Sequence, residues 1–201
     1  MIKNQDRSKW FGASDTSFIT GNYDTNTFCL WWLEKLGYRK NNFQNKYTLA
    51  GTNYEHKIAK FIEKEFNTKL KLDRQKKIRK YRLRVNFDAT SKNLNEEIKT
   101  SNKVFEKVPR NYWEQTQVQM FADKKLQTRL SVYLMEDDNY LDYFLELKRE
   151  NFQFFIIDYD NDFIKNKYLP RLRYLNKCLC KKELPTNKGF SDYYGKSYNA
   201  H

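Results

Sequence analysis

The stretch "LRVNFDATSKNLNEEIKTS", residues 83–101, decides the fold because two short alternating segments flank a polar loop. From Tyr81 to Asp88, apolar residues alternate with polar ones, with Arg82 and Arg84 on the polar face, and this period of two is typical of a half-buried strand. The segment "NEEIKT", residues 95–100, follows as a second strand. We therefore predict a hairpin whose polar face ends in the carboxylate of Asp88.

The second strand of this hairpin presents a carboxylate and a lysine on one face. Alternation places Glu97 with Lys99, whereas Glu96 and Ile98 point to the opposite side. Pairing across the loop is expected to bring Asp88 close to Glu97. An exposed hairpin of mixed charge is the alternative interpretation. Two converging carboxylates repel one another, however, and a divalent metal ion between them removes that conflict.

These residue types suit magnesium and the hydrolysis of a phosphodiester. Magnesium prefers oxygen ligands and keeps several waters, so Asp88, Glu97 and the main-chain carbonyl of Ile98 form a plausible partial shell. We expect manganese to substitute for it. A bound metal lowers the pKa of a water ligand, and Lys99 would orient that water and balance the charge that builds on the phosphate. The pattern predicts a phosphodiesterase.

The charge of the chain indicates a polyanionic partner. Lysine and arginine number 38 against 25 acidic residues, a formal net charge of +13, and many of the basic residues lie between 69 and 84. This run lacks the segregated apolar face of a membrane-surface helix. We expect Arg82 and Arg84 to contact the phosphates of a nucleic acid, with a solvated basic face as the alternative.

The length of 201 residues and the composition favour one compact domain, residues 1–182, followed by a tail at 183–201 with the composition of a flexible end. No stretch approaches 18 apolar residues, and the first ten residues lack the apolar core of a signal peptide. We therefore expect a cytoplasmic protein without a membrane partner. Three cysteines, an odd number, are read as free thiols rather than as a disulfide or metal framework.

The remaining patterns predict helices around the hairpin and further strands behind it. We expect an α/β domain in which a central mixed β-sheet is flanked by helices. Helices are predicted at 14–21, where Ser14 or Asp15 caps, at 25–37, at 53–67 with Asn53 as cap, at 110–124 and at 160–182, and strands at 128–136 and 152–159, with 143–147 ambiguous. Core positions are expected for Trp10, Trp31, Trp32 and Trp113, with platforms for base stacking as the alternative.

One carboxylate stands out on the predicted helix 53–67. Glu55 lies in the row of Ala59, Ile62 and Phe66, so it projects toward the apolar side of that helix. An ion pair with a lysine, Lys99 included, would explain it, and so would a place beside a metal site.

Four motifs in order resemble a known family. Asp88, Glu97 and Lys99 match the D…(D/E)xK signature of the PD-(D/E)XK nucleases, with Phe87 where the family name has proline. The segments "RSKWFGASDTSFITG", "GTNYEHKIAKFI" and "YWEQTQVQMF" are similar to the R…GASD…G, G…YE and Y…QxQ…M motifs of the lambda exonuclease and YqaJ-type viral recombinase branch. The resemblance covers 7–182 and implies a restriction-endonuclease-like core.

The resemblance also implies roles for residues outside the hairpin. Arg7 would contact the terminal 5'-phosphate of DNA, and Ser14 would help to hold phosphate, unless it only caps a helix. Glu55 would bear on the metal site as a further candidate ligand. Gln115 would close the site from the next helix, although Gln115 and Gln119 could instead make structural hydrogen bonds.

The implied activity is a magnesium-dependent DNA exonuclease of the phage recombination type, which degrades linear duplex DNA from its 5' end. Its implied partners are double-stranded DNA ends and a single-strand annealing protein, and related enzymes assemble as homo-oligomeric rings, commonly trimers. Two alternatives stay open. A site-specific or structure-specific endonuclease of restriction or repair shares this chemistry, and a DNA-binding module without catalysis shares the fold.

Overall fold

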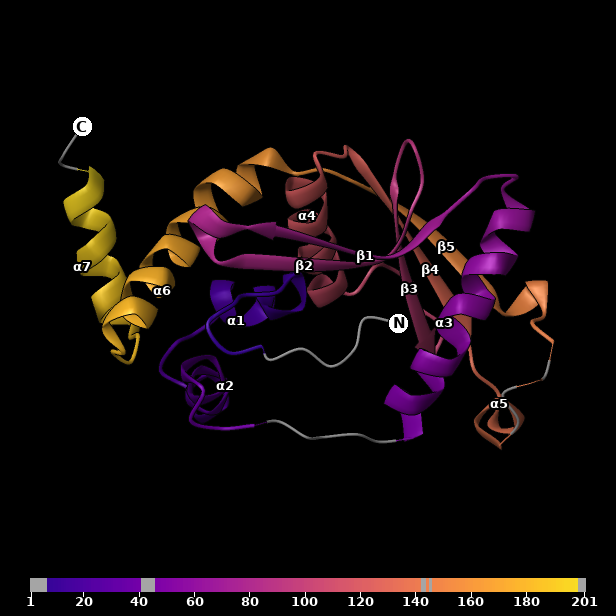
Figure 1. Cartoon of the computed structure of the whole chain (residues 1–201), viewed down its shortest axis with the longest axis horizontal. Helices are drawn as coiled ribbons and strands as arrows, with labels where there is room; N and C mark the ends of the chain where they lie inside the picture. Colours follow the sequence, from indigo (N-terminus) through magenta and orange to yellow (C-terminus); the bar gives the residue numbers. More distant parts are fainter. Residues whose placement is uncertain (1–6, 41–45, 142–143, 145, 199–201) are drawn as a thin grey trace.

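A computed structural model of the chain describes residues 7–40, 46–141, 144 and 146–198. Its centre is a five-stranded sheet in the order β1-β2-β3-β4-β5, in which β3 and β4 are parallel and the other neighbours are antiparallel. The mixed sheet confirms the predicted α/β class (Figure 1). The strands are β1 (Lys71–Ile78), β2 (Leu83–Thr90), β3 (Asn95–Ser101), β4 (Gln127–Leu134) and β5 (Phe152–Asp158).

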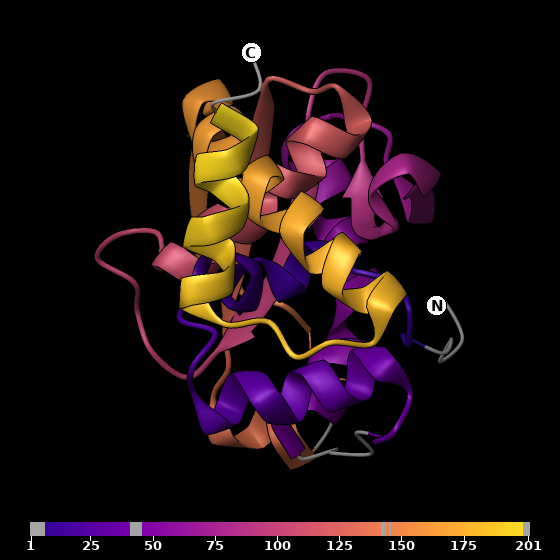
Figure 2. The same ribbon diagram turned by 90° about the vertical axis from the view of Figure 1, so that its left-hand side faces the viewer.

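Helices cover both faces of the sheet and one of its ends. The long helix α3 packs against β3 on one face, while α4 lies on the other face (Figure 1). At the end remote from α3, the helices α6 and α7 lie side by side (Figure 2). The helices are α1 (Thr16–Thr20), α2 (Asn26–Leu36), α3 (Lys46–Glu65), α4 (Arg110–Asp123), α5 (Asp137–Leu141), a π-helical turn (Phe163–Tyr168) that leads into α6 (Leu169–Lys181), and α7 (Asn187–Tyr198).

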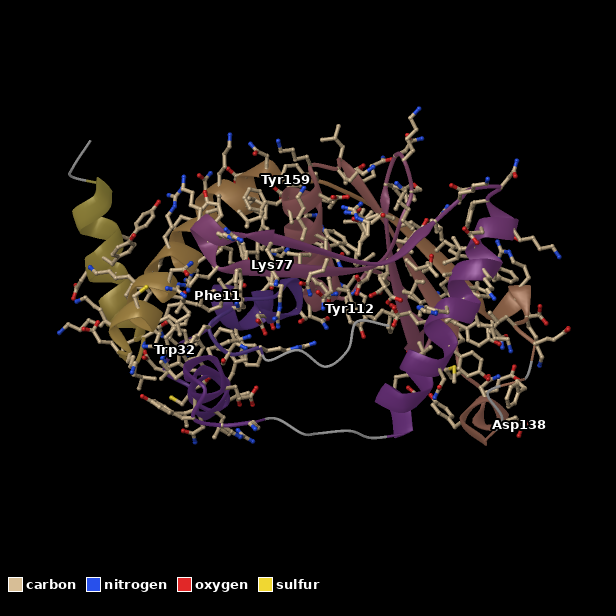
Figure 3. All side chains as sticks on the ribbon, viewed as in Figure 1. Phe11, Trp32, Lys77, Tyr112, Asp138 and Tyr159 are labelled. Atoms are coloured by element: carbon tan, nitrogen blue, oxygen red, sulfur yellow. The ribbon has the colours of Figure 1, made fainter. Side chains whose placement is uncertain are left out.

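The largest apolar cluster joins distant parts of the chain and fixes the N-terminal helices to the hairpin (Figure 3). Leu83, Val85 and Phe87 of β2 belong to it, as the alternation predicts. Phe11 and Trp32, both fully buried, enter the same cluster from the N-terminal segment and from α2. Full burial of a large apolar side chain stabilises the fold by about 1.5–3 kcal/mol. The N-terminal residues are thereby held beside the polar face of β2.

A second cluster lies under α3 and a third under α4. Tyr54, Ile58 and Ile62 of α3 are fully buried against β3 and its neighbours, as the predicted apolar stripe requires. Phe66 departs from that stripe because it lies beyond the end of α3 and is exposed. On the opposite face, Met120 of α4 packs against β4 and β5.

The strand β1 is absent from the sequence-based prediction. Its residues look like part of a basic run, because both faces of the strand carry charged side chains. On one face, Arg74 and Lys76 form ion pairs with Asp123 at the end of α4, with N–O distances of 2.6 and 3.7 Å. An edge strand tolerates such charge because one of its sides remains open to water. Part of the basic run is therefore structural.

Two helical regions also differ from the prediction. The helix predicted from 53 begins at Lys46, so Asn53 is inside α3 and is not its cap. The C-terminal region, predicted to be a flexible end, contains the helix α7. The described residues of 143–147 form no strand, and the rest of that range lies outside the described residues. Among the described residues, none of the helices is long and apolar enough to cross a bilayer.

Candidate active site

The register of β2 and β3 brings Asp88 and Glu97 together. Ala89 pairs with Glu96 in this antiparallel ladder, so the next step of the register sets Asp88 opposite Glu97 on one face. The ladder stops there, and Oδ2 of Asp88 accepts a hydrogen bond of 2.8 Å from the main-chain N–H of Ile98. The predicted parity of this strand is confirmed.

Glu96 points to the other face of the sheet. There it forms a buried ion pair with Arg129 of β4, whose guanidinium donates to both carboxylate oxygens, and Ser131 adds a longer hydrogen bond of 3.4 Å. A buried charge needs such a partner. Glu96 is thus committed to the structure of the sheet and is separated from Asp88.

Glu97 is fully buried and is held by donors from two elements. Its Oε1 accepts from the ammonium of Lys99 and from the side-chain amide of Gln115, while its Oε2 accepts from the amide of Gln119. Both glutamines belong to α4, four residues apart. Gln115 and Gln119 therefore both contact the acidic pair through Glu97.

The electrostatics of the pair match a site that takes a cation. Burial, and next the negative charge of Glu97, raise the pKa of Asp88 well above its usual range. For Lys99, burial alone would lower the pKa, but the charges of Glu97 and Asp88 outweigh it and raise that pKa. The ammonium balances one carboxylate of the pair. The carboxylate of Asp88 remains to bind a hard divalent cation, which prefers oxygen ligands.

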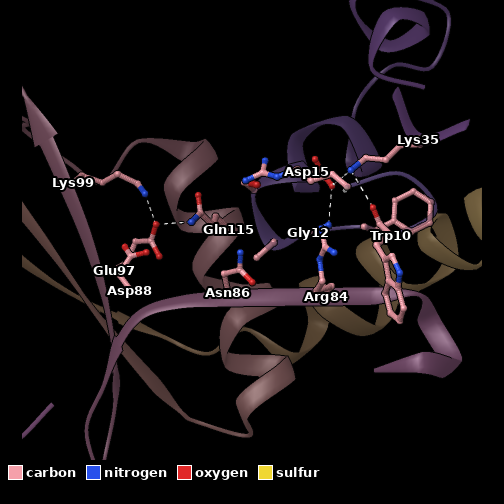
Figure 4. Close-up of a pocket in the computed structure, with 14 residues that line it drawn as sticks. Trp10, Gly12, Asp15, Lys35, Arg84, Asn86, Asp88, Glu97, Lys99 and Gln115 are labelled. Atoms are coloured by element: carbon pink, nitrogen blue, oxygen red, sulfur yellow. Dashed lines mark hydrogen bonds and ion pairs between the residues drawn. The ribbon is translucent and has the colours of Figure 1, made fainter. Parts of the chain in front are cut away.

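These groups line one end of an elongated pocket of about 260 Å³. Asp88, Glu97 and Lys99 lie at one end, while Trp10, Lys35 and Arg84 lie at the other (Figure 4). Of the predicted phosphate-binding residues, Arg7, Ser14 and Arg84 line the pocket. Its full lining is Arg7, Trp10, Phe11, Gly12, Ala13, Ser14, Asp15, Lys35, Arg84, Asn86, Asp88, Glu97, Lys99 and Gln115.

The turn that carries Ser14 is braced by the buried side chain of Asp15. Oδ2 of Asp15 accepts from the main-chain N–H of Gly12 at 2.7 Å and from Nζ of Lys35 at 2.6 Å, and Oδ1 accepts from the indole of Trp31 at 3.0 Å. Asp15 therefore closes its own turn in place of the helix cap predicted for it. Ser14 stays exposed on the pocket wall.

Arg82 does not line the pocket with Arg84, so its contact with a DNA phosphate stays a prediction. Arg82 precedes β2 and adopts a left-handed conformation with φ of 47°, which breaks the alternation of the strand. Its guanidinium donates to the thiol of Cys180 on α6 at 3.5 Å. Only Arg84 of the two faces the pocket.

Glu55 approaches the acidic pair from α3 without lining the pocket. Burial, and next the charge of Asp73, raise the pKa of Glu55, and Glu97 adds to the effect. Oδ2 of Asp73 lies 2.8 Å from Nε2 of His56, within hydrogen-bond distance. In β1, Asp73 lies between Leu72 and Arg74, which pair with Ala89 and Phe87 of β2, and its own φ of 52° interrupts the ladder. Because β1 was not predicted, the sequence offered no signal for Asp73.

The tryptophans separate into two groups. Trp31 and Trp32 are buried in the largest cluster, and Trp113 packs against it beside Phe163, as expected for core residues. Trp10 is different because its side chain is half-buried and lines the pocket. The expectation of a core position is wrong for Trp10.

No protein-family model matches the chain, and no curated protein matches its sequence. Solved structures match its fold. The alkaline exonuclease LHK-Exo from Laribacter hongkongensis has a TM-score of 0.65 at 16% identity, over 88% of this chain and 94% of that one. A phage-related exonuclease from Haemophilus somnus 129PT has a TM-score of 0.67 at 17% identity, over 87% of this chain and 96% of the other.

A further structure, LHK-Exo in complex with dAMP, matches with a TM-score of 0.66 at 16% identity, over 88% of this chain and 94% of that one. The likeness spans nearly the whole of both chains. It agrees with the mixed sheet and the flanking helices described above. The chain has the fold of these alkaline and phage-related exonucleases.

Proposed function

We propose that the protein is a metal-dependent DNA exonuclease of the phage recombination type, which hydrolyses phosphodiester bonds from the 5' end of linear duplex DNA. The observation that carries the proposal is that two groups of residues line the same pocket. Asp88, Glu97 and Lys99 form its acidic end, and Arg7 and Ser14 stand on its wall. The fold shared with proteins described as exonucleases, one of them solved with dAMP, supports the same activity.

Magnesium is the proposed cofactor, with manganese as its substitute. Asp88, Glu97 and the main-chain carbonyl of Ile98 would hold the ion, with Glu55 as a further candidate ligand. Burial and the charge of Glu97 raise the pKa of Asp88, as expected for two neighbouring carboxylates whose repulsion a bound cation would reduce. The bound ion supplies an acidified water and polarises a phosphoryl oxygen.

The residues of the chain itself orient the reactants. Lys99, which forms an ion pair with Glu97, would direct the attacking water and balance charge on the phosphate. Gln115 and Gln119 fix the two oxygens of Glu97, so that this side chain keeps one orientation while substrate enters. We therefore assign Lys99 the catalytic role and the glutamines a positioning role.

The basic wall of the pocket explains the proposed preference for a DNA end. Arg7 and Ser14 would take the terminal 5'-phosphate, and Arg84 a phosphate of the same strand. Charged hydrogen bonds from arginine to phosphate are among the strong ones in proteins. A cytoplasmic single-strand annealing protein would receive the exposed strand, and a ring of several copies would enclose the duplex.

One assay separates the proposal from its alternatives. Purified protein with magnesium is incubated with linear duplex bearing 5'-phosphates, linear duplex lacking them, and closed circular duplex. The proposal predicts fast degradation of the first, slower degradation of the second and none of the third. Cutting of closed circles would establish an endonuclease, and binding without cutting of any substrate would establish a DNA-binding module.

A matched pair of variants tests the assignment of the carboxylates. Glu97→Gln is expected to abolish cleavage, because an uncharged amide replaces a proposed metal ligand. Glu96→Gln is expected to keep cleavage, because Glu96 faces Arg129 on the other side of the sheet. The opposite pattern would show that the wrong glutamate has been assigned.

A further inference from the structure

Trp10 occupies an unusual place for a large aromatic residue. It is half-buried and lines the end of the pocket opposite the acidic pair (Figure 4). An indole offers an apolar face for stacking, and aromatic side chains are typical of sites that hold the bases of single-stranded nucleic acid. Packing explains Trp31 and Trp32, which are buried, and leaves the position of Trp10 unexplained.

The main chain around Trp10 is fixed on both sides. Its carbonyl accepts a hydrogen bond of 3.0 Å from Nζ of Lys35, which is 3% exposed. On the N-terminal side, the N–H of Lys9 donates to the carbonyl of Lys35 at 2.8 Å, and on the C-terminal side the N–H of Phe11 donates to the carbonyl of Arg82 at 2.8 Å. The indole is therefore presented by a rigid frame, which lowers the entropy lost when a ligand binds.

A cation lies over the indole, and a second belongs to the same face of the hairpin. Nζ of Lys77 lies 5.7 Å from the centroid of the Trp10 ring. In the β1–β2 register, Lys77 pairs with Arg84, which lines the pocket, so both side chains leave the hairpin on the pocket face (Figure 3 labels Lys77). Between this pair and Asp88, the side chains of Gln75 and Asn86 join through a hydrogen bond of 3.0 Å. The polar face of the hairpin thus runs from acids through amides to cations.

The polar face of the hairpin is longer than one phosphate group. Asp88 and Arg84 are four residues apart on β2, a span of about 13 Å at the rise of a strand. A metal-bound phosphate at Asp88 leaves the Trp10 end to another part of the same polynucleotide. A base with its phosphate combines an aromatic face with a negative charge, and Trp10 with Arg84 and Lys77 offers the complement of both.

We propose that Trp10, Lys77 and Arg84 form a nucleotide subsite, in which a base of the bound DNA strand stacks on the indole and its phosphate is held by the two cations. The subsite would set the register of the strand relative to the acidic pair. This inference rests on the proposed function, because it requires DNA in the pocket. Lys35 acts as a positioning residue through the carbonyl of Trp10.

The test uses binding in calcium, which replaces magnesium and avoids cleavage. A fluorescent duplex with a 5'-phosphorylated single-stranded end is prepared intact and with an abasic site at each of its first four positions in turn. Its affinity is measured for the wild-type protein, for Trp10→Leu, which keeps apolar volume without a stacking face, and for Trp10→Phe. Trp113→Phe serves as the control outside the pocket, and thermal unfolding of each variant verifies its fold.

We expect one abasic position to weaken binding to the wild-type protein about tenfold, the lower part of the range for base–aromatic stacking. In Trp10→Leu, that position should cost no more than the others, while Trp10→Phe restores part of the difference and Trp113→Phe leaves it intact. Equal losses in the wild-type protein and Trp10→Leu would overturn the subsite. If the effect appears in calcium while no substrate is cut in magnesium, the subsite stands and the proposed nuclease activity fails.

Discussion

At the scale of single residues, the pair Asp88 and Glu97 controls both the stability and the chemistry of the site. Alternation in residues 95–100 separated Glu97 from Glu96, because the parity of a strand is strict even where both of its faces are buried, as they are here. The sequence could not reveal that Glu97 is held by two amides of α4. Such a contact joins residues 18 and 22 positions apart in the chain and depends on the packing of that helix.

The repulsion between the two carboxylates predicts an unusual effect of substitution. In chelator, Asp88→Asn should raise the free energy of unfolding by roughly 1 kcal/mol, the scale of an ordinary single change but of opposite sign. The asparagine keeps an acceptor for the N–H of Ile98 while removing the charge that burial and Glu97 oppose. Urea unfolding with and without magnesium measures the effect, and the stabilisation by magnesium should be lost in the variant.

The direction of the pH dependence follows from the same shift. The pKa of Asp88 is raised in the folded protein, so the folded state retains a proton that the unfolded state has released. The free energy of unfolding of the metal-free protein should therefore fall as pH rises from the usual aspartate range through the raised pKa. Asp88→Asn should flatten that fall. A wild-type protein whose difference from Asp88→Asn is the same at all pH values would contradict this account.

At the scale of secondary structure, the hairpin β2–β3 could be predicted and its outer neighbour β1 could not. The pattern of β2 is clear because one face is buried against the large apolar cluster. In contrast, β1 is an edge strand with charge on both faces, and Asp73 within it has a left-handed φ of 52°. The tail was misjudged for a related reason, since α7 is a polar helix that packs against α6 mainly through aromatic residues.

The contact between β1 and α4 provides a prediction at this scale. Arg74 donates to both oxygens of Asp123, which is 6% exposed on its side chain. Asp123→Asn should lower the free energy of unfolding by about 2 kcal/mol, because it leaves a partly buried guanidinium without its counter-charge. Glu136→Gln, in an exposed pair with Lys148, is the control and should change it by less than about 0.5 kcal/mol. Equal effects of the two would show that β1 is not held by this ion pair.

At the scale of the whole molecule, the composition indicates a kind of partner but does not identify the residues that would meet it. The net charge of +13 indicates a polyanion, yet Arg74 and Lys76 are engaged with Asp123, and Arg82 turns toward α6. The pocket is instead assembled from the N-terminal segment, α2, the hairpin and α4. Local sequence patterns do not show which of these distant elements come together. Only the ordered motifs of the family resemblance indicated that their residues lie near one another.

The different positions of two neighbouring arginines provide a prediction at this scale. In calcium, the affinity for a duplex end should fall with salt concentration, because bound cations are released from phosphates. Arg84→Gln should reduce the slope of log affinity against log salt by about one unit, while Arg82→Gln leaves it close to the wild-type value. Fluorescence anisotropy over a salt series measures both slopes. A larger loss in Arg82→Gln would place the DNA path outside the pocket.

The rate of hydrolysis in Lys99→Met tests the central claim most directly. Under single-turnover conditions with magnesium and a 5'-phosphorylated linear duplex, the variant should cleave at least about a hundredfold more slowly than the wild-type protein, because it lacks the ammonium beside the scissile phosphate. Its affinity for the same DNA in calcium should stay within about threefold, well below a tenfold or 1.4 kcal/mol change. Cleavage at the wild-type rate by Lys99→Met would contradict the account.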